Sequence, residues 1–286
     1  MAAQYPGAVK DFATNVDLST EVNAAYMNER DEEIEAIQGA IGIRPWGGAY
    51  GMFQNLLNLR GFWPMSAFNE NAHAIDFSSQ SRNLTPNGGS PAGPTSNMLF
   101  AIPYAAFTTD QYFSRTSEAG LEITGTESWL ADNALKGLTL GGWFYVTSLA
   151  SAGYFIAKDD LSARSYGLYH QTDGSIRFGM FDSLSSYWEV VSSTNISINT
   201  WYFLVGRAAI GSGSRDVFIN AVKTADTSLP PPTEISNAAA DFCVGARSDA
   251  TAFLNGNAAL CFVCASALSD TVISTLFSQT RRRFGV

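Results

Sequence analysis

The sequence predicts an all-β fold, a sandwich of two antiparallel sheets preceded by a single N-terminal helix. Aromatic residues make up 13% of the 286 residues, charged residues only 15%, and glycine occurs 25 times, as is typical of β proteins with many turns. Short strand-like runs with turn sequences between them fill the second half of the chain, a pattern typical of sandwiches. Hydrophobic residues, at 46%, supply enough apolar side chains for a sizeable core.

Charge and hydropathy argue against two classes of partner. The net charge of −9 disfavours contact with the phosphate backbone of nucleic acid. No apolar run of the sequence approaches the roughly 20 residues that a membrane-spanning helix needs. The start, MAAQYPGAVK, lacks the basic residues and apolar run of a secretory signal, so we expect a soluble protein made without conventional export.

Residues 1–45 differ from the rest of the chain. A short arm, YPGAVKDFATNVD, precedes a charged segment with a helical period. Ser19 or Thr20 offers an N-cap for this helix, and Gly42 with Pro45 ends it. The sequence thus predicts three parts: an arm and helix at 1–45, a glycine-rich connector at 46–58, and a β domain at 59–286.

The apolar residues of this helix form a narrow seam. Met27, Ile34 and Ile41 recur every seven residues, and Ile37 lies on the same seam. Residues 21–35 contain six acidic residues and one arginine. The helix could lie on its own domain with its acids in solvent, or it could pair with identical helices. A narrow seam with charge on both flanks favours a short coiled coil between chains, although about three turns would need help from the attached domains.

The β domain is expected to begin with an aromatic strand in FQNLLNLRGFWPM, followed by a long turn-rich loop at residues 77–97. The later strand-like runs are GLTLGGWFYVTSL, YFIAKDD, YGLYHQ, SIRFGMF, YWEVVSS and TWYFLVGRAAIGSGSRDVFINAV. The turns TDG and GSGSRD predict two hairpins within this series. The last segment, LSDTVISTLFSQTRRRFGV, is expected to be a helix capped by Ser269 or Asp270.

The order of these segments resembles a laminin-G-like domain of the concanavalin-A-like jelly-roll class, over about residues 59–280. The motifs that carry the resemblance are LRGFWPMSAFNENAHAIDFSSQSRNLTPNGG, the strand around Trp143, and FLNGNAALCFVCASALSD. The resemblance implies a jelly-roll sandwich. Many members carry an acidic pair shortly after the equivalent of Asn255–Gly256, whereas this chain has Ala259 and Leu260, so no calcium role is expected for that pair.

The first 45 residues are similar to the N-terminal segments of phage virion proteins, particularly tail-fibre and head-associated ones. The motif that carries this likeness is YPGAV…VDLSTEVNAAYMNERDEEIEAIQGAIG. The similarity implies attachment to other virion proteins through the arm and a homo-oligomer, commonly a trimer. It also implies a virion assembled in the host cytoplasm.

The sequence offers little sign of catalysis. The Glu-x-Asp-x-x-Glu pattern that places acid and nucleophile of jelly-roll glycosidases on one face does not occur. The two histidines, His73 and His170, lie in no nucleophile motif, and His170 is expected at the surface or half-buried. We therefore expect a protein that is not an enzyme, with a glycoside hydrolase as the least favoured function.

Cysteines and carboxylates give weak metal signals. Cys243, Cys261 and Cys264 are best explained as small buried hydrophobic residues, because a buried strand turns Cys261 and Cys264 to opposite faces. Scattered carboxylates could bind calcium, although turn acids more often cap or face solvent. The candidates are Asp159 and Asp160 with Asp173, Asp249 or Asp76. No cofactor is expected, and calcium is the alternative.

A carbohydrate site is the usual expectation for this class of fold, an argument by analogy. The segment SLSSYWEVV places Tyr187 beside Trp188, so alternation turns one of the two rings outward. We expect these residues to bind ligand if the face is not covered.

The predicted function is a phage virion structural protein, a fibre or decoration subunit that displays the jelly roll for surface or glycan contact. The alternative is a carbohydrate-binding receptor-recognition module.

Overall fold

The computed structural model describes residues 47–65, 74–88, 92–95, 104–108, 110–115, 137–181, 186–209, 214–226, 235–236 and 239–286. The chain divides into two units after Met52, and both sheets belong to the unit Phe53–Val286. The predicted arm and helix at 1–45 lie outside the described residues, as does His73. The same holds for the seam residues, which are Met27, Ile34, Ile37 and Ile41.

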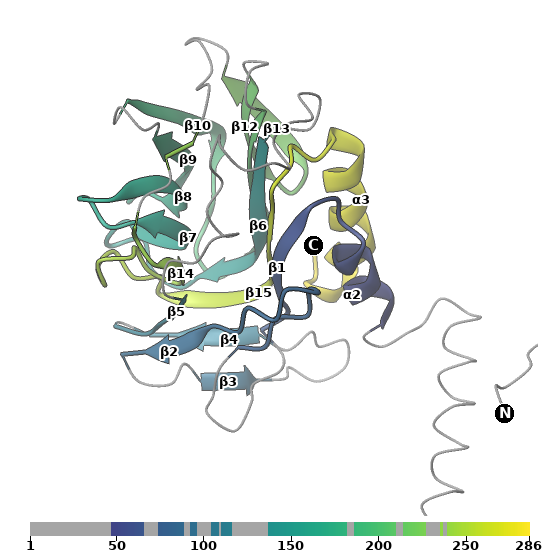
Figure 1. The fold of residues 1–286 in the computed structure, drawn as a ribbon, viewed down its shortest axis with the longest axis horizontal. Helices are drawn as coiled ribbons and strands as arrows, with labels where there is room; N and C mark the ends of the chain where they lie inside the picture. Colours follow the sequence, from purple (N-terminus) through teal and green to yellow (C-terminus); the bar gives the residue numbers. More distant parts are fainter. Residues whose placement is uncertain are drawn as a thin grey trace, which may run out of the picture. The chain divides into compact units, whose positions relative to one another are not determined.

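The predicted sandwich is confirmed: the described strands form two sheets, and every pair of neighbouring strands is antiparallel (Figure 1). The first sheet has the order β13-β12-β11-β6-β15-β4-β3, with β1 also paired to β15. Its strands are β1 (Leu59–Trp63), β3 (Ala92–Thr95), β4 (Tyr104–Phe107), β6 (Gly137–Val146), β11 (Trp201–Ala209), β12 (Ser214–Ile219), β13 (Val222–Asp226) and β15 (Gly256–Cys264).

The second sheet has the order β10-β9-β8-β7-β14-β5-β2. Its strands are β2 (Thr85–Asn87), β5 (Tyr112–Arg115), β7 (Gly153–Asp159), β8 (Arg164–His170), β9 (Ser175–Phe181), β10 (Tyr187–Asn195) and β14 (Phe242–Val244). Both predicted hairpins are present, as β8–β9 and β11–β12. Gly174 supplies the positive φ of +81° that the β8–β9 turn requires.

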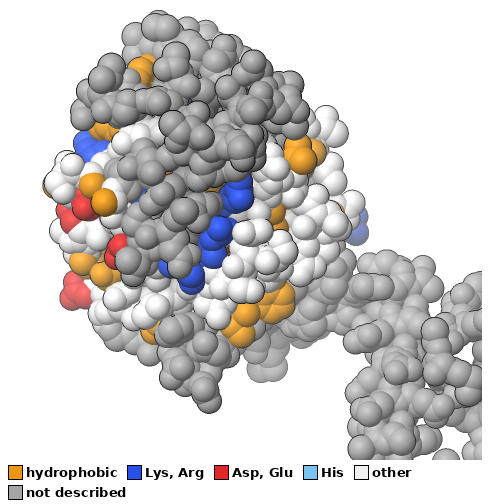
Figure 2. All heavy atoms as spheres, in the orientation of Figure 1, with side chains coloured by type: hydrophobic (Ala, Val, Ile, Leu, Met, Phe, Trp, Pro, Cys, Tyr) orange, Lys and Arg blue, Asp and Glu red, His pale blue; other side chains and the backbone are white. Residues whose placement is uncertain are grey.

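The main core fills the space between the two sheets. Alternate residues of each strand point into it, among them Leu140 and Phe144 of β6 and Leu168 of β8, all almost completely buried. On the face drawn in Figure 2, acidic side chains of described residues lie toward the left edge, several basic ones lie near the centre, and broad uncharged surface lies to the right. No helix among the described residues is long and apolar enough to cross a membrane.

The helix α3 (Asp270–Thr280) covers the outer face of the eight-stranded sheet and is followed by a 3-10 turn, η2 (Arg281–Arg283) (Figure 1). The prediction of this helix is confirmed, and Ser269 is its N-cap, with its side chain accepting from the amide of Val272. Trp143 of β6 lies under the helix and not between the sheets. Its indole N–H donates to Thr280 Oγ1 at 2.9 Å, and its ring stacks on Phe284.

Two segments predicted as irregular contain regular structure. The helix α2 (Gly47–Gln54) occupies much of the expected connector at 46–58, and its end is fixed by Phe53, which is fully buried and stacks on Phe62. The expected loop at residues 77–97 contributes β2 and β3 at the ends of the two sheets. Pro86 and Pro94 obscure these short strands in the sequence, because proline is usual only on edge strands.

The expectation that His170 is exposed or half-buried is wrong. His170 is 1% exposed, because alternation along β8 turns it to the same side as Leu168, where its ring packs on Phe155 of the main core. Burial lowers the pKa of His170, since the charged imidazolium would lose its hydration. The three cysteines are buried and free, as predicted, and burial raises the pKa of each thiol.

Candidate functional site

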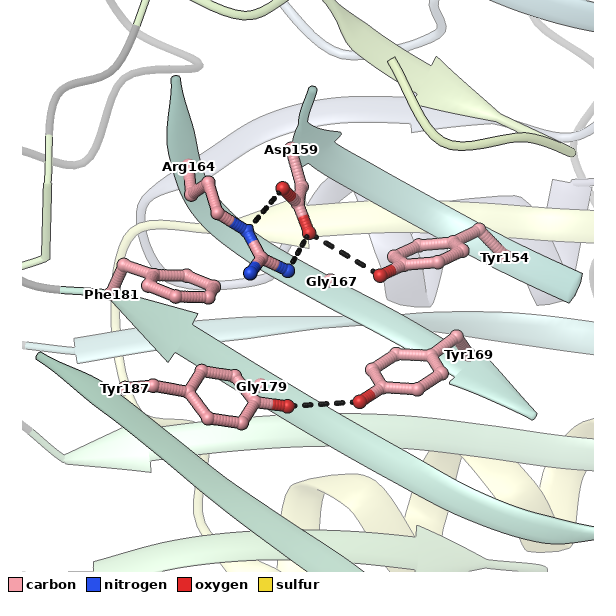
Figure 3. Close-up of a pocket in the computed structure, with 8 residues that line it drawn as sticks. All are labelled: Tyr154, Asp159, Arg164, Gly167, Tyr169, Gly179, Phe181 and Tyr187. Atoms are coloured by element: carbon pink, nitrogen blue, oxygen red, sulfur yellow. Dashed lines mark hydrogen bonds and ion pairs between the residues drawn. The ribbon is translucent and has the colours of Figure 1, made fainter. Parts of the chain in front are cut away.

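Among the described residues, a small hollow on the outer face of the seven-stranded sheet is the strongest candidate for a binding site (Figure 3). It lies across β7, β8, β9 and β10 and is called the β7–β10 hollow. Its lining residues are Tyr154, Asp159, Arg164, Gly167, Tyr169, Gly179, Phe181 and Tyr187. Alternation explains the position of two of them: Leu168 of β8 points into the core, which turns its neighbours Gly167 and Tyr169 outward.

Two glycines form the floor of the hollow. Gly167 of β8 and Gly179 of β9 are direct partners across the hairpin. A Cβ atom on Gly167 would lie 2.7 Å from Cε1 of Tyr154, and one on Gly179 would lie 2.9 Å from the ring of Tyr187. Both distances are too short for carbon atoms in contact, so glycine at these positions allows the two tyrosine rings to lie against the sheet.

Tyr187 is the exposed ring of the hollow, with 41% of the residue accessible to solvent. Its hydroxyl donates to Oε1 of Glu189, which also accepts from the hydroxyl of Tyr169. The two hydroxyl oxygens are 2.9 Å apart, and Figure 3 shows the two rings meeting at this point. The Tyr187 ring also packs on Phe181, with centroids 4.7 Å apart. The exposed ring is therefore held in place by the protein itself.

An ion pair closes one end of the hollow. Arg164 donates to Asp159 through Nε at 2.7 Å and Nη2 at 2.8 Å, a bidentate arrangement (Figure 3). The same guanidinium lies 4.0 Å from the centre of the Phe181 ring, within reach of a cation–π contact. The side chain of Asp159 is 3% exposed and that of Arg164 is 32% exposed. A ligand would therefore meet the arginine and not its carboxylate partner.

Two further ion pairs border the hollow. Arg177 of β9 donates to Oε2 of Glu189 at 2.7 Å, so the carboxylate that holds Tyr187 is itself held by a cation. Arg247 binds Asp249 through Nε at 3.0 Å and Nη2 at 2.8 Å. The Arg247 guanidinium lies 5.9 Å from the centre of the Tyr154 ring. Each of the three arginines around the hollow thus has a carboxylate partner.

The tyrosines of the hollow keep their protons. Burial raises the pKa of Tyr154 to about 12, with the nearby charge of Asp159 as the second cause. Burial also raises the pKa of Tyr169 and of Tyr187, and the hydrogen bonds of both hydroxyls to Glu189 raise them further. The three hydroxyls consequently act as hydrogen-bond donors at neutral pH.

The structure separates the two residues that the sequence predicts as ligand-binding. Tyr187 lines the hollow, whereas Trp188 points the other way and packs against the main core. Alternation along β10 therefore turns one ring outward, as expected, and that ring is Tyr187. Binding by either residue stays a prediction, since no ligand contact has been observed.

The candidate calcium ligands do not converge. Asp159 and Asp249 are occupied by arginines, and Asp173 accepts from Ser175 within the β8–β9 turn. Asp76 accepts from the backbone amides of Phe62, Ser78 and Arg82 and from the Ser78 hydroxyl. Asp160 accepts from Ser162 and Ala163 in a turn. In the described part of the chain, no three His, Cys, Asp or Glu side chains gather as a metal site.

Sequence reasoning missed most of the hollow. Tyr154, Tyr169 and the glycine floor were not singled out. The sequence did contain an indication of the glycine floor. Gly167 and Gly179 are separated by the same number of residues from Asp173, the middle of the predicted TDG turn. In a hairpin, such residues face each other across the strands. Two glycines facing each other inside aromatic strands indicate a close approach of other atoms.

The fold matches known proteins. The family model described as the concanavalin A-like lectin/glucanases superfamily, Laminin_G_3, matches residues 117–274, more than half of the chain. No match was found among curated proteins.

Solved structures with the same fold are distant in sequence. The binding domain of botulinum neurotoxin DC in complex with rat synaptotagmin II is 12% identical with a TM-score of 0.53, covering 78% of this chain and 51% of that one. Domain 4 of AbnA, a GH43 extracellular arabinanase from Geobacillus stearothermophilus in complex with arabinotriose, is 16% identical with a TM-score of 0.53, covering 77% and 98%. The chain spans about half the length of the toxin structure. By its family match and its two-sheet architecture, this chain belongs to the concanavalin A-like lectin/glucanases superfamily.

Proposed function

We propose that the protein binds carbohydrate in the β7–β10 hollow, and that it does so as the displayed domain of an oligomeric virion structural protein. The observation that carries the first part is the ring of Tyr187, exposed yet fixed by Glu189 over the glycine floor. A sugar ring has an apolar face of C–H groups and a rim of hydroxyls. The hollow offers an aromatic face beside charged groups, and binding sites commonly combine such apolar and polar groups.

Preorganisation strengthens this proposal. A ligand that stacks on Tyr187 does not have to immobilise the ring, because Glu189, Tyr169 and Phe181 already hold it. The fold is shared with domain 4 of AbnA, which was solved with arabinotriose, and this supports a saccharide as the ligand class. Both carboxylates of the hollow, Asp159 and Glu189, are engaged by arginines, so we propose binding without hydrolysis.

Tyr187→Ala is expected to weaken glycan binding by about tenfold or more, because it removes the one exposed ring of the hollow. Tyr187→Phe should retain most of the affinity, since it keeps the ring and loses only the bond to Glu189. The measurement is a bacterial polysaccharide array followed by titration calorimetry. Val191→Ala is the matched control, because Val191 is 39% exposed on the same strand and lines no part of the hollow.

The outcomes of this experiment are distinct. Full affinity in Tyr187→Ala would place the ligand elsewhere and contradict the site. Release of reducing ends from the bound polysaccharide would contradict binding without hydrolysis. Loss of binding in the presence of a chelator would contradict the expectation that no cofactor is needed and would favour calcium, the alternative.

The second part of the proposal, a virion fibre or decoration subunit assembled in the host cytoplasm, is supported by the sequence of residues 1–45. The seven-residue spacing of Met27, Ile34 and Ile41 favours self-association through a coiled coil, with a trimer as the expected form. We expect the full chain to sediment as an oligomer and a variant without residues 1–45 to sediment as a monomer. A full chain that sediments as a monomer would contradict the second part of the proposal. It would not affect the proposed glycan site.

A further inference from the structure

We infer that the β7–β10 hollow selects neutral glycans over carboxylated ones such as uronates and sialosides. The inference rests on the proposed carbohydrate binding and narrows its ligand class. It is carried by the pairing of the charges that surround the hollow: each of the arginines Arg164, Arg177 and Arg247 is bound to a carboxylate of the protein.

Two of the three arginines, Arg164 and Arg247, already use their strongest geometry on a carboxylate of the protein. A guanidinium binds a carboxylate best through two parallel N–H groups. Arg164 already uses Nε and Nη2 on Asp159, and Arg247 uses the same two atoms on Asp249. Arg177 binds Glu189, which in turn holds Tyr187. An acidic sugar would have to compete with these internal partners.

Displacing an internal partner is unfavourable. The side chain of Asp159 is 3% exposed and that of Glu189 is 17% exposed. A sugar carboxylate that captured Arg164 or Arg177 would leave one of these acids without its cation and poorly hydrated, which is strongly disfavoured. The acid would also repel the incoming anion at short range. The chain as a whole carries a net charge of −9, which adds a weaker repulsion at low salt.

A neutral sugar avoids this conflict. A hydroxyl group both donates and accepts, so neighbouring hydroxyls can donate to remaining lone pairs of a carboxylate and accept from remaining N–H groups of its arginine. The Arg177–Glu189 pair presents both kinds of group, with side chains that are 30% and 17% exposed, whereas the Arg164–Asp159 pair presents N–H groups of its arginine, since Asp159 is 3% exposed. Such a ligand leaves every ion pair intact.

The test uses pairs of ligands that differ only in charge. The probes are polygalacturonate and acidic bacterial capsular polysaccharides, each with its carboxyl-reduced, neutral form, together with neutral envelope polysaccharides. We expect Tyr187-dependent binding of neutral forms, weakened about tenfold or more by a carboxylate. We also expect the neutral affinity to change by less than about twofold between roughly 0.01 M and 1 M salt.

A gain-of-function variant tests the cause. Asp249→Asn removes the partner charge of Arg247 and should raise the affinity for carboxylated forms several-fold at low salt while leaving neutral binding nearly unchanged. Asp173→Asn is the charge-matched control, because the Asp173 carboxylate accepts from Ser175 in the β8–β9 turn and is not the ion-pair partner of Arg164, Arg177 or Arg247. The control should not gain affinity for acidic forms.

The outcomes separate the inference from the proposed function. Tyr187-dependent binding that requires the sugar carboxylate would overturn the inference and leave carbohydrate binding in place. No gain in Asp249→Asn beyond that in Asp173→Asn would overturn the charge-pairing argument. No Tyr187-dependent binding of any probe, neutral or acidic, would overturn both.

Discussion

Trp143→Ala is expected to lower the free energy of unfolding by about 3–5 kcal/mol, the range for removing a large buried aromatic side chain. Trp143 is fully buried between the outer face of the eight-stranded sheet and the C-terminal helix. Its ring contacts Phe203 of the neighbouring strand and stacks on Phe277 and Phe284. The substitution would therefore leave a cavity under α3 and remove the contacts that hold the helix to the sheet.

Equilibrium denaturation with guanidinium measures this loss. Trp143→Phe keeps most of the volume and removes the indole bond to Thr280, so it should cost about 1–2 kcal/mol. Hydrogen exchange should show faster exchange in α3 for the alanine variant. Glycan binding by the folded fraction should be unchanged, because the β7–β10 hollow lies on the other sheet. A loss of less than about 1 kcal/mol in the alanine variant would contradict this account of how α3 is held.

Arg207→Met is expected to destabilise the protein by about 3–5 kcal/mol, because it leaves a buried acid without its cation. Asp216 is 0% exposed and accepts from Nε of Arg207 at 2.7 Å across the β11–β12 pair. The same guanidinium donates to the Leu268 carbonyl at 2.6 Å and reaches Asp270 at 2.7 Å. One arginine thus joins two strands to the start of α3.

A paired substitution distinguishes the loss of the ion pair from the loss of packing. Arg207→Met with Asp216→Leu replaces both charges by apolar groups, and we expect it to recover at least half of the stability lost in Arg207→Met. Thermal denaturation of the wild type, both single variants and the double variant completes the cycle. A double variant no more stable than Arg207→Met would show that the buried charge is not the cause.

The order of the sheets could be predicted only in part. The strands β6 to β12 alternate or form long apolar runs with clear turns between them, so the sequence predicts them and the two hairpins β8–β9 and β11–β12. β4, β5 and β14 have four residues or fewer, too short for alternation to be read. Their position depends on the neighbours with which they pair, and single-sequence patterns do not contain that information. Ser269 is a contrasting case, because an N-cap is a local signal, and the sequence narrowed it to Ser269 or Asp270.

The candidate site, like the sheets, could be predicted from the sequence only in part. Alternation predicts that one of Tyr187 and Trp188 faces outward, but the choice depends on which ring the core accommodates. The pair of Asp159 and Arg164 could not be foreseen either, because the register of β7 against β8 shifts between Lys158 and Asp159. Such a bulge changes the direction in which a side chain points, and the alternation of polar and apolar residues in the sequence does not predict where a bulge occurs.

The small size of the hollow has a consequence for attachment. One well-exposed ring can bury only part of one sugar, so a single copy is expected to bind with a Kd of about 1 mM, near −4 kcal/mol. If several copies are joined in a fibre, each bound copy keeps the others near the surface, and combined binding can become about 10²–10⁴ times tighter. Individual contacts would then break and re-form quickly while the particle stays on the cell. A particle attached in this way could move along a repetitive polysaccharide by exchanging one weak contact for the next.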